Sequence, residues 1–160
     1  MAEIYLRPLR MEDAQISWKW RNDPRVWKYT CSRPTCEVTL AMEEAWMRKV
    51  LSESNSRRFA ICLREGDKYV GNGYVVNIDW ERKCGEFAIF LGDVSVWGRG
   101  IGTQANLELQ KAAGACGLRE VTARIHVSNP GSLKTVLKAG FSELSRDGEW
   151  ILTGKRLDVS

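Results

Sequence analysis

One stretch constrains the fold of this chain more than any other, because an apolar segment, a loop with alternating glycines and a helical segment follow one another from Glu86 to Ala113. Five successive apolar residues after Glu86 predict a strand that is covered on both faces. In the loop, Gly98, Gly100 and Gly102 let the backbone turn tightly and bring its N–H groups close to a ligand. The helix adds free N–H groups and the positive end of its dipole. The stretch therefore predicts a site for an anion such as a pyrophosphate.

Dinucleotides, nucleoside triphosphates and coenzyme A all carry a pyrophosphate. The dinucleotide fingerprint G-x-G-x-x-G and the Walker loop G-x-x-x-x-G-K-[ST] are both absent from the 160 residues. A glycine-rich turn that binds no ligand is the alternative for this loop.

The loop resembles the acetyl-coenzyme A (acetyl-CoA) loop of the GCN5-related N-acetyltransferases (GNAT), whose pattern is Gln/Arg-x-x-Gly-x-Gly/Ala. Gly100 and Gly102 match, and Trp97 stands where Gln or Arg is usual. That departure is familiar from the RimJ/RimL-like branch, which often reads Trp-Gly-Lys-Gly here. The segment from Asn129 to Phe141 is similar to a second element of the same branch. Two motifs in the right order argue against a chance likeness.

Length and composition predict one domain over residues 1–160, large enough to form its own core. No apolar run approaches the ~18 residues of a membrane span, and no charged-then-apolar leader precedes the first predicted strand. We therefore expect a cytoplasmic protein without a membrane partner. The net charge of +4 is too small and scattered to indicate nucleic acid.

The cysteines and the histidine indicate neither disulfides nor a metal site. Five cysteines without a C-x-x-C pattern favour buried thiols in a reducing compartment; Cys62 and Cys116 fall in apolar patterns. His126 is the only histidine, which excludes a histidine-based metal cluster, and it lies in an alternating strand pattern.

Alternation and capping signals predict the remaining elements. Strands are expected at residues 3–9, 57–64, 68–80, 84–91, 120–126, 141–146 and 149–157, and helices at 11–22, 38–51, from the glycine loop to Gly117, and from Asn129 to Gly140. The GNAT resemblance implies an α/β (α+β) fold. Its mixed, mostly antiparallel sheet of six to seven strands is split between strands four and five, flanked by about four helices, and holds acetyl-CoA in the split.

The resemblance also assigns binding residues. For the donor these are the end of the fourth strand, the glycine loop, the start of the following helix and the asparagine that contacts the pantetheine arm: Phe90, Leu91, Gly92, Gly98, Arg99, Gly100, Ile101, Gly102, Thr103 and Asn129. For the acceptor they are Trp20, Arg21 and Asn22, in a string similar to the first-helix end of RimJ/RimL-like and aminosugar N-acetyltransferases. A place in the core is the alternative for each tryptophan of this region.

Transfer of an acetyl group from a thioester to an amine needs a base for the amine and a proton for the thiolate. Glu86 is the predicted base, since burial raises a carboxyl pKa and several GNAT enzymes use a glutamate on this strand. Its alternative is a structural ion pair with an arginine such as Arg82. Many family members place a tyrosine acid seven residues after the motif asparagine, where this chain has Val136. The RimJ/RimL-like pattern instead implies a serine three residues after the asparagine, which makes Ser132 the predicted acid; an ordinary serine of the first helical turn is the alternative.

We expect direct acetyl transfer to a primary amine in a ternary complex. A protein N-terminus, an aminosugar and a polyamine all remain open as acceptors; Glu43 and Glu44 would suit a polycation, and Arg21, Arg57 and Arg58 a phosphate. The competing prediction is a catalytically silent acyl-CoA sensor or interaction domain, which would need neither Glu86 nor Ser132. A nucleotide-binding regulator would require the missing dinucleotide fingerprint. Assembly as a homodimer stays open.

Overall fold

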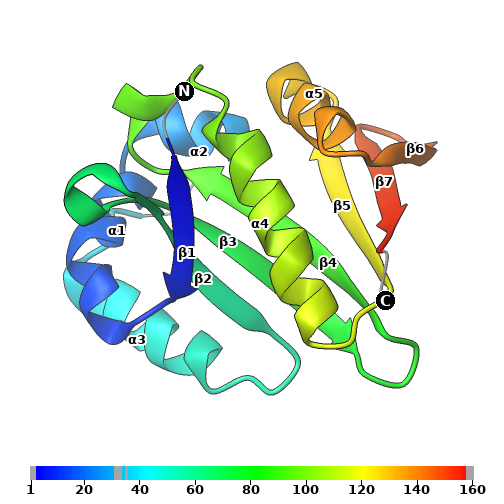
Figure 1. The fold of residues 1–160 in the computed structure, drawn as a ribbon. Coiled ribbons are helices and arrows are strands. Elements are labelled where there is room, and N and C mark those ends of the chain that lie inside the picture. Colours follow the sequence, from blue (N-terminus) through cyan, green and yellow to red (C-terminus); the bar gives the residue numbers. More distant parts are fainter. Residues whose placement is uncertain (1–2, 31–33, 35, 158–160) are drawn as a thin grey trace.

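The computed structural model describes residues 3–30, 34 and 36–157, and a seven-stranded sheet runs through them (Figure 1). The strands are β1 (Ile4–Pro8), β2 (Arg57–Leu63), β3 (Lys68–Asp79), β4 (Cys84–Leu91), β5 (Glu120–His126), β6 (Ser142–Asp147) and β7 (Trp150–Arg156). Their order is β1-β2-β3-β4-β5-β7-β6, and every neighbouring pair is antiparallel except the parallel pair β4 and β5. The predicted mixed, mostly antiparallel sheet is confirmed.

Five α-helices lie in the described ranges: α1 (Ala14–Arg21), α2 (Pro24–Thr30), α3 (Leu40–Leu51), α4 (Ile101–Ala115) and α5 (Pro130–Lys138). The sequence pattern does not predict α2, because Asp23 and Pro24 indicate only the end of the first helix. The same pair starts the next one. Pro24 occupies the first helical position, where its missing N–H costs nothing, and an oxygen of Asp23 accepts the N–H of Arg25 at 2.9 Å.

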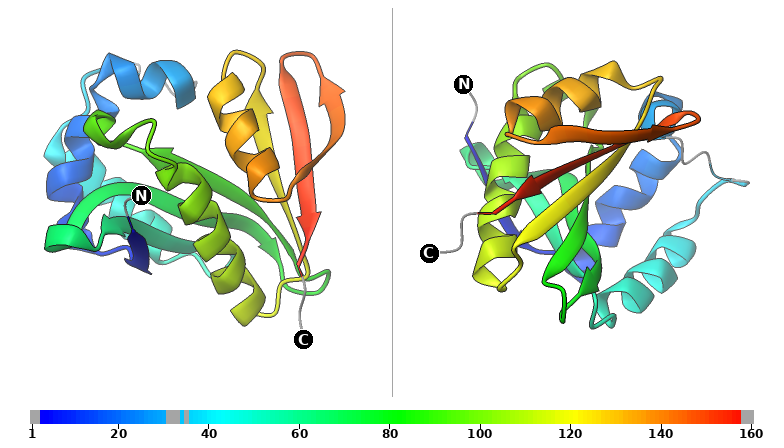
Figure 2. Two further views of the ribbon diagram at one scale, coloured as in Figure 1. Left: turned by 45° about the horizontal axis from the view of Figure 1, so that its top comes forward. Right: turned by 90° about the vertical axis from the view of Figure 1, so that its right-hand side faces the viewer.

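The helices form a layer on each side of the sheet. α1 and α3 lie against one side of β1 to β4, and α4 crosses the other side, with α5 beside it over β5 (Figure 2). We call these sides the α1 face, which carries Tyr74, Ala88 and Thr122, and the α4 face, which carries Val75, Phe87 and Val121. No helix in the described ranges is both long and apolar enough to cross a lipid bilayer.

The core of the α4 face follows from a stripe with one buried residue per helical turn. Ile101, Ala105, Leu109 and Ala113 are each at most 2% exposed, as expected for a helix that packs one side on a sheet. The sequence pattern continued this side to Cys116, which was wrong. Cys116 is exposed because it follows the last residue of α4 and caps its C-terminus.

The expectation of buried thiols holds for only one of the described cysteines. Cys62 is buried on β2, and burial raises the pKa of its thiol. Cys36 and Cys116 are exposed, and Cys84 is half-buried. Cys31 lies outside the described residues.

The split in the sheet lies between β4 and β5. The two strands pair at only three positions, Cys84 with Glu120, Gly85 with Val121 and Glu86 with Thr122. Beyond this point they separate toward their carboxyl ends (Figure 1). The end of β4 and the end of β5 therefore form the two arms of a fork.

The prediction that β4 is covered on both faces was wrong at one position. Phe87 is buried on the α4 face, whereas Ala88 is exposed on the α1 face. The reason is the fork, because β5 no longer lies beside β4 at Ala88.

Candidate active site

Glu86 lies at the base of the fork, in the last residue pair between β4 and β5. Its Oε1 accepts a hydrogen bond from Nε of Arg124 at 2.9 Å, and its Oε2 accepts one from Nδ2 of Asn77 at 3.0 Å. The side chain of Glu86 is 20% exposed and that of Arg124 is 63% exposed. An ion pair with so exposed a partner stabilises a fold by only about 0–1 kcal/mol. Its main effect here is to orient the carboxylate.

The ion pair considered as the alternative role of Glu86 is therefore present, but with a different arginine. Arg124 reaches back from β5 across the fork, whereas the guanidinium of Arg82 lies 3.9 Å from the carboxylate of Asp79. The alternation of residues 120–126 offered a signal, because it places Thr122 and Arg124 on the same face of β5. The partner could not be identified without the register between β4 and β5.

The loop between β4 and α4 has the conformation that its glycines allow. Gly98 and Gly100 have φ angles of 80° and 76°, in the left-handed region that disfavours a side chain. Gly100 is the N-cap of α4 and offers no side chain to the free N–H groups of the first turn. Ile101 is 1% exposed and belongs to the core, so its side chain points away from this helix end. An anion at this helix end would meet free donors and the positive end of the dipole.

Two further residues of this segment belong to the predicted anion site. Arg99 is exposed between the two glycines, and Thr103 is half-buried in the first turn of α4. The arginine adds a positive charge to the loop, whose one carboxylate, Asp93, is paired with Lys68 at 3.0 Å. The loop, the uncapped helix end and this charge suit an anion, and the assignment of these residues to a pyrophosphate stays a prediction.

Trp97 connects the loop to β4. Its Nε1 donates a hydrogen bond to the carbonyl oxygen of Leu91 at 2.9 Å. The residue that departs from the GNAT pattern thus joins the start of the loop to the end of the strand. This contact holds the glycines against the arm of the fork from which they emerge.

The second arm of the fork leads into α5. The Oδ1 atom of Asn129 accepts the backbone N–H of Ser132 at 3.1 Å, and Pro130 occupies the first helical position, so the predicted N-cap is confirmed. Ser132 is half-buried in the first turn. α4 and α5 approach closely, since a Cβ atom on Gly102 would lie 3.3 Å from Cγ2 of Thr135.

The end of β4 depends on Trp20. This ring is 9% exposed and contacts Tyr69 and Phe90 at centroid distances of 4.7 and 6.2 Å. It also covers Gly92, where an added Cβ would lie 1.9 Å from the ring. The structure thus places Trp20 in the core, beneath the residues expected to bind the donor. Its predicted contact with the acceptor stays a prediction.

Arg21 and Asn22, the other two expected acceptor residues, hold the wall formed by α1 and α3. Asn22 donates to the carbonyl of Val38 at 2.7 Å and accepts its N–H at 2.8 Å, which fixes the segment that enters α3. Arg21 donates to Glu43 at 3.0 Å and stacks over Trp46 at 5.3 Å. The side chain of Arg21 is still 41% exposed.

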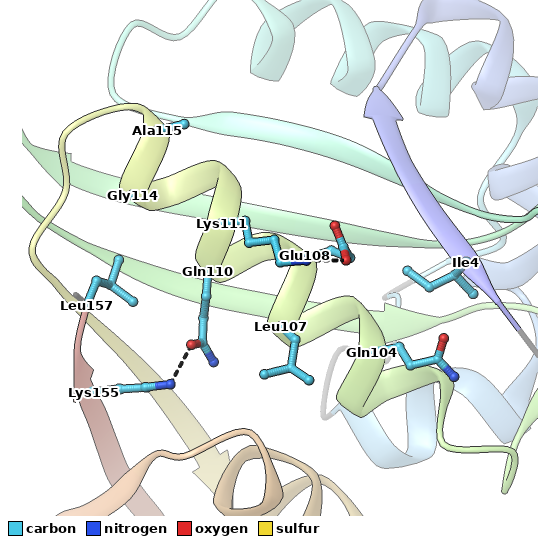
Figure 3. Close-up of a pocket in the computed structure, with 10 residues that line it drawn as sticks. All are labelled: Ile4, Gln104, Leu107, Glu108, Gln110, Lys111, Gly114, Ala115, Lys155 and Leu157. Atoms are coloured by element: carbon cyan, nitrogen blue, oxygen red, sulfur yellow. Dashed lines mark hydrogen bonds and ion pairs between the residues drawn. The ribbon is translucent and has the colours of Figure 1, made fainter. Parts of the chain in front are cut away.

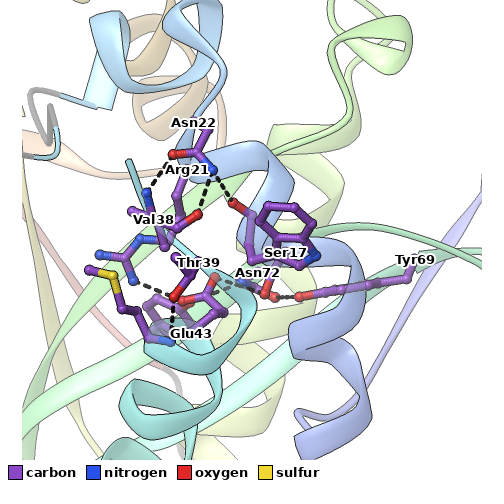
Figure 4. A network of polar contacts seen from close by, with 11 residues as sticks. Ser17, Arg21, Asn22, Val38, Thr39, Glu43, Tyr69 and Asn72 are labelled. Carbon is purple, nitrogen blue, oxygen red and sulfur yellow. Dashed lines mark hydrogen bonds and ion pairs between the residues drawn. The ribbon is translucent and has the colours of Figure 1, made fainter. Parts of the chain in front are cut away.

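Glu43 belongs to a buried polar network on the α1 face (Figure 4). It is 1% exposed and accepts hydrogen bonds from Ser17 and Arg21, both at 3.0 Å. Its two oxygens therefore already have donors, unlike those of the open carboxylate expected for a polycation.

A second set of buried polar groups lies on β3. Asn72 accepts the hydroxyl proton of Tyr69 and donates to the hydroxyl of Tyr74 at 2.9 Å. Burial raises the pKa of both tyrosines, so both stay protonated at neutral pH. These hydroxyls fix Asn72 beneath Phe90, its neighbour on β4.

A groove of about 730 Å³ lies away from the fork, over the outer side of α4 (Figure 3). Leu107, Lys111 and Ala115 line it, and Lys155 from β7 reaches Gln110 at 2.7 Å. None of the predicted site residues lines this groove. Among the described residues, no group of three His, Cys, Asp or Glu side chains could hold a metal ion.

The comparisons with known proteins agree on one family. Residues 3–142 match the family model described as "Acetyltransferase (GNAT) domain". The chain is 30% identical over 160 residues to a protein of Bacillus licheniformis named "Uncharacterized N-acetyltransferase p20", covering 98% of this chain and 89% of that one.

Solved structures share the fold at lower sequence identity. A spermidine N-acetyltransferase from Vibrio cholerae, in complex with CoA and spermine, superposes with a TM-score of 0.85 at 16% identity, over 96% of this chain and 95% of that one. An aminoglycoside acetyltransferase, AAC(6')-Ib, in complex with coenzyme A, superposes with a TM-score of 0.78 at 17% identity over the same shares. At these identities the likeness concerns the fold.

Proposed function

The chain belongs to the GNAT acetyltransferase family, and on that premise we propose that it transfers the acetyl group of acetyl-CoA to a primary amine. The observation that carries the proposal is the fork, which opens beside the uncapped N-terminus of α4 and has a carboxylate at its base. A RimJ/RimL-like acceptor preference is part of the proposal and rests on the two sequence motifs alone.

The donor is held by backbone groups more than by side chains. The N–H groups from Gly98 to Thr103 and the charge of Arg99 bind the pyrophosphate. The backbone of Phe90, Leu91 and Gly92 lies along the pantetheine arm on one side of the fork, and Asn129 lies on the other. Trp97 and Trp20 act indirectly, by fixing the loop and the strand end.

The chemistry belongs to the base of the fork. Glu86 takes up the proton that the amine loses when its nitrogen bonds to the acetyl carbon, directly or through a water molecule. Ser132 donates a proton to the sulfur as the carbon–sulfur bond breaks. Each oxygen of Glu86 accepts one hydrogen bond and keeps a second lone pair for a proton, and protonation of Glu86 would weaken its ion pair with Arg124. The 63% exposure of this arginine leaves it room to turn away.

The same ion pair supports a second candidate, a catalytically silent acyl-CoA-binding domain. A carboxylate that stays paired with Arg124 would serve only to join β4 and β5 at the fork. Such a domain would bind acetyl-CoA through the same loop and transfer nothing.

The test is release of free thiol from acetyl-CoA in the presence of a panel of amines, with product masses measured in parallel. The panel includes an N-terminal peptide, glucosamine and spermidine, because a protein N-terminus, an aminosugar and a polyamine all remain candidates. Acetylated product above the rate without amine supports the enzyme. Binding of acetyl-CoA without any product supports the silent domain. A protein that neither binds acetyl-CoA nor forms product would contradict both candidates.

A further inference from the structure

Ala88 is the one exposed residue of β4. Its neighbours on the same face are Glu86 and Phe90, and its partner across the sheet on β3 is Tyr74. An alanine that stays exposed in such a strand has open space above its methyl group, because larger neighbours would otherwise cover so small a side chain.

Ala88 lies between two neighbouring parts of the structure that both stop short of covering it. On one side, Tyr74 is 8% exposed beneath Arg58 and Trp46, which lie 4.5 and 6.2 Å from its ring centre. On the other side, β5 has already separated from β4 after Glu86. The open space above Ala88 is thus bounded by the wall of α1 and α3 and by the fork itself.

The chemistry of this space follows from its neighbours. Glu86 and Ala88 point to the same face two residues apart, about 6.6 Å at the usual rise of a strand. The half-buried Phe90 presents aromatic carbon beside Ala88 and is covered in turn by Trp20, whereas the ring of Tyr74 lies beneath Arg58 and Trp46. An amine near Glu86 would therefore have its adjacent carbon atoms over an apolar surface.

We propose that Ala88 is a specificity-determining residue, whose methyl group forms the floor of the acceptor site and sets how wide an amine can be. The proposal rests on the proposed function and adds a substrate class, namely a primary amine with an apolar carbon segment next to the nitrogen. A larger side chain at position 88 narrows the site without contact with the donor, which occupies the gap between β4 and β5.

The kinetic test compares Ala88→Leu with Ala115→Leu. Both replace an exposed alanine by leucine, but Ala115 lines the α4 groove away from the fork. For Ala88→Leu, kcat/KM for a wide amine such as phenethylamine should fall about 10-fold or more, the usual effect of excess methylenes in an apolar site. It should fall much less for ethylamine, and KM for acetyl-CoA should stay unchanged. Ala115→Leu should behave as the parent protein.

A binding test works without turnover. Protein carrying ¹³C-methyl alanine is titrated with phenethylamine in the presence of CoA, and the Ala88 signal is assigned by its loss in Ala88→Ser. We expect that signal to shift and the Ala115 signal to stay.

The results separate this inference from the proposed function. Acetylation that Ala88→Leu leaves unchanged for every amine, or a KM for acetyl-CoA that rises in step with the loss, would overturn the role of Ala88 alone. A shift of the Ala88 signal without acetylation of any amine would retain the binding site and overturn the enzyme. If the Ala88 signal does not shift and no amine is acetylated, both the role of Ala88 and the proposed function are overturned.

Discussion

At the scale of single residues, the proposed function depends on Glu86 and on the two groups that donate hydrogen bonds to it. Arg124 and Asn77 each hold one carboxylate oxygen. These contacts orient the carboxylate, and they also use one acceptor position on each of its oxygens. A variant that removes the carboxylate must therefore be compared with one that removes only the ion pair.

Glu86→Gln should lower turnover on the order of 10²-fold or more, the usual contribution of a general base, with little change in affinity for acetyl-CoA. The loss should shrink as pH rises, because more of the amine is then neutral without help. Initial rates across pH 6 to 9, around the neutral optimum of such catalysis, measure both effects.

Arg124→Gln is the matched control, since it loses the same ion pair and keeps the carboxylate. Its turnover should stay well above that of Glu86→Gln. Equal losses in the two variants would mean that the ion pair, and not the base, is what the reaction needs.

Gly92→Ala tests the position of Trp20. The added Cβ would lie 1.9 Å from the ring, so the variant should lose about 1–3 kcal/mol of unfolding free energy, as overpacked cores do. Trp20→Leu makes room for the new methyl group. It should therefore lower the free energy of unfolding less in the Gly92→Ala background than in the parent protein. Additive effects in denaturant titrations would show that Trp20 does not press on Gly92.

At the scale of elements, the proposed donor site lies where α4 and α5 approach each other, because both helices begin at the arms of the fork. A Cβ on Gly102 would meet Cγ2 of Thr135 at 3.3 Å, whereas one on Gly114 would meet nothing within 4 Å. A glycine-to-alanine substitution should therefore affect the contact between α4 and α5 at Gly102 but not at Gly114.

Gly102→Ala should weaken acetyl-CoA binding by roughly tenfold, or about 1.4 kcal/mol, because the new methyl group crowds Thr135 and shifts the helix pair at the proposed donor site. Gly114→Ala should leave affinity unchanged. Thr135→Ser removes Cγ2 and keeps the hydroxyl that donates to Gly131, so it should restore binding to Gly102→Ala. Calorimetric titration gives all three values, and a normal affinity in Gly102→Ala would exclude control by this contact.

The elements also show which features the sequence could predict. The seven strands follow from alternation, and the Asn129 cap from a local signal that needs no tertiary information. The pairing of Glu86 with Arg124 could not be predicted, because it joins residues 38 positions apart through the register of two strands. The exposure of Ala88 depends on where β5 separates from β4. The apolar residues on both sides of Ala88 instead predict a strand that is covered on both faces.

At the scale of the whole molecule, a donor that binds only the folded chain stabilises it by mass action. Acetyl-CoA at 100 times its Kd should raise the melting temperature by about 5–10 °C for a chain of this size. NAD and ATP should raise it far less, since the chain lacks their fingerprints. A larger shift with NAD would contradict the donor assignment.

The fork has one more consequence. Past Glu86, alternate backbone amides and carbonyls of β4 and β5 point toward each other across the gap without pairing as a ladder, so the sheet has two inner edges as well as its outer ones. An extended ligand with its own hydrogen-bonding groups can bind between these edges in the way an extra strand would. Amide hydrogen exchange along residues 87–91 should then slow when the gap is filled, most at the alternate positions that face it.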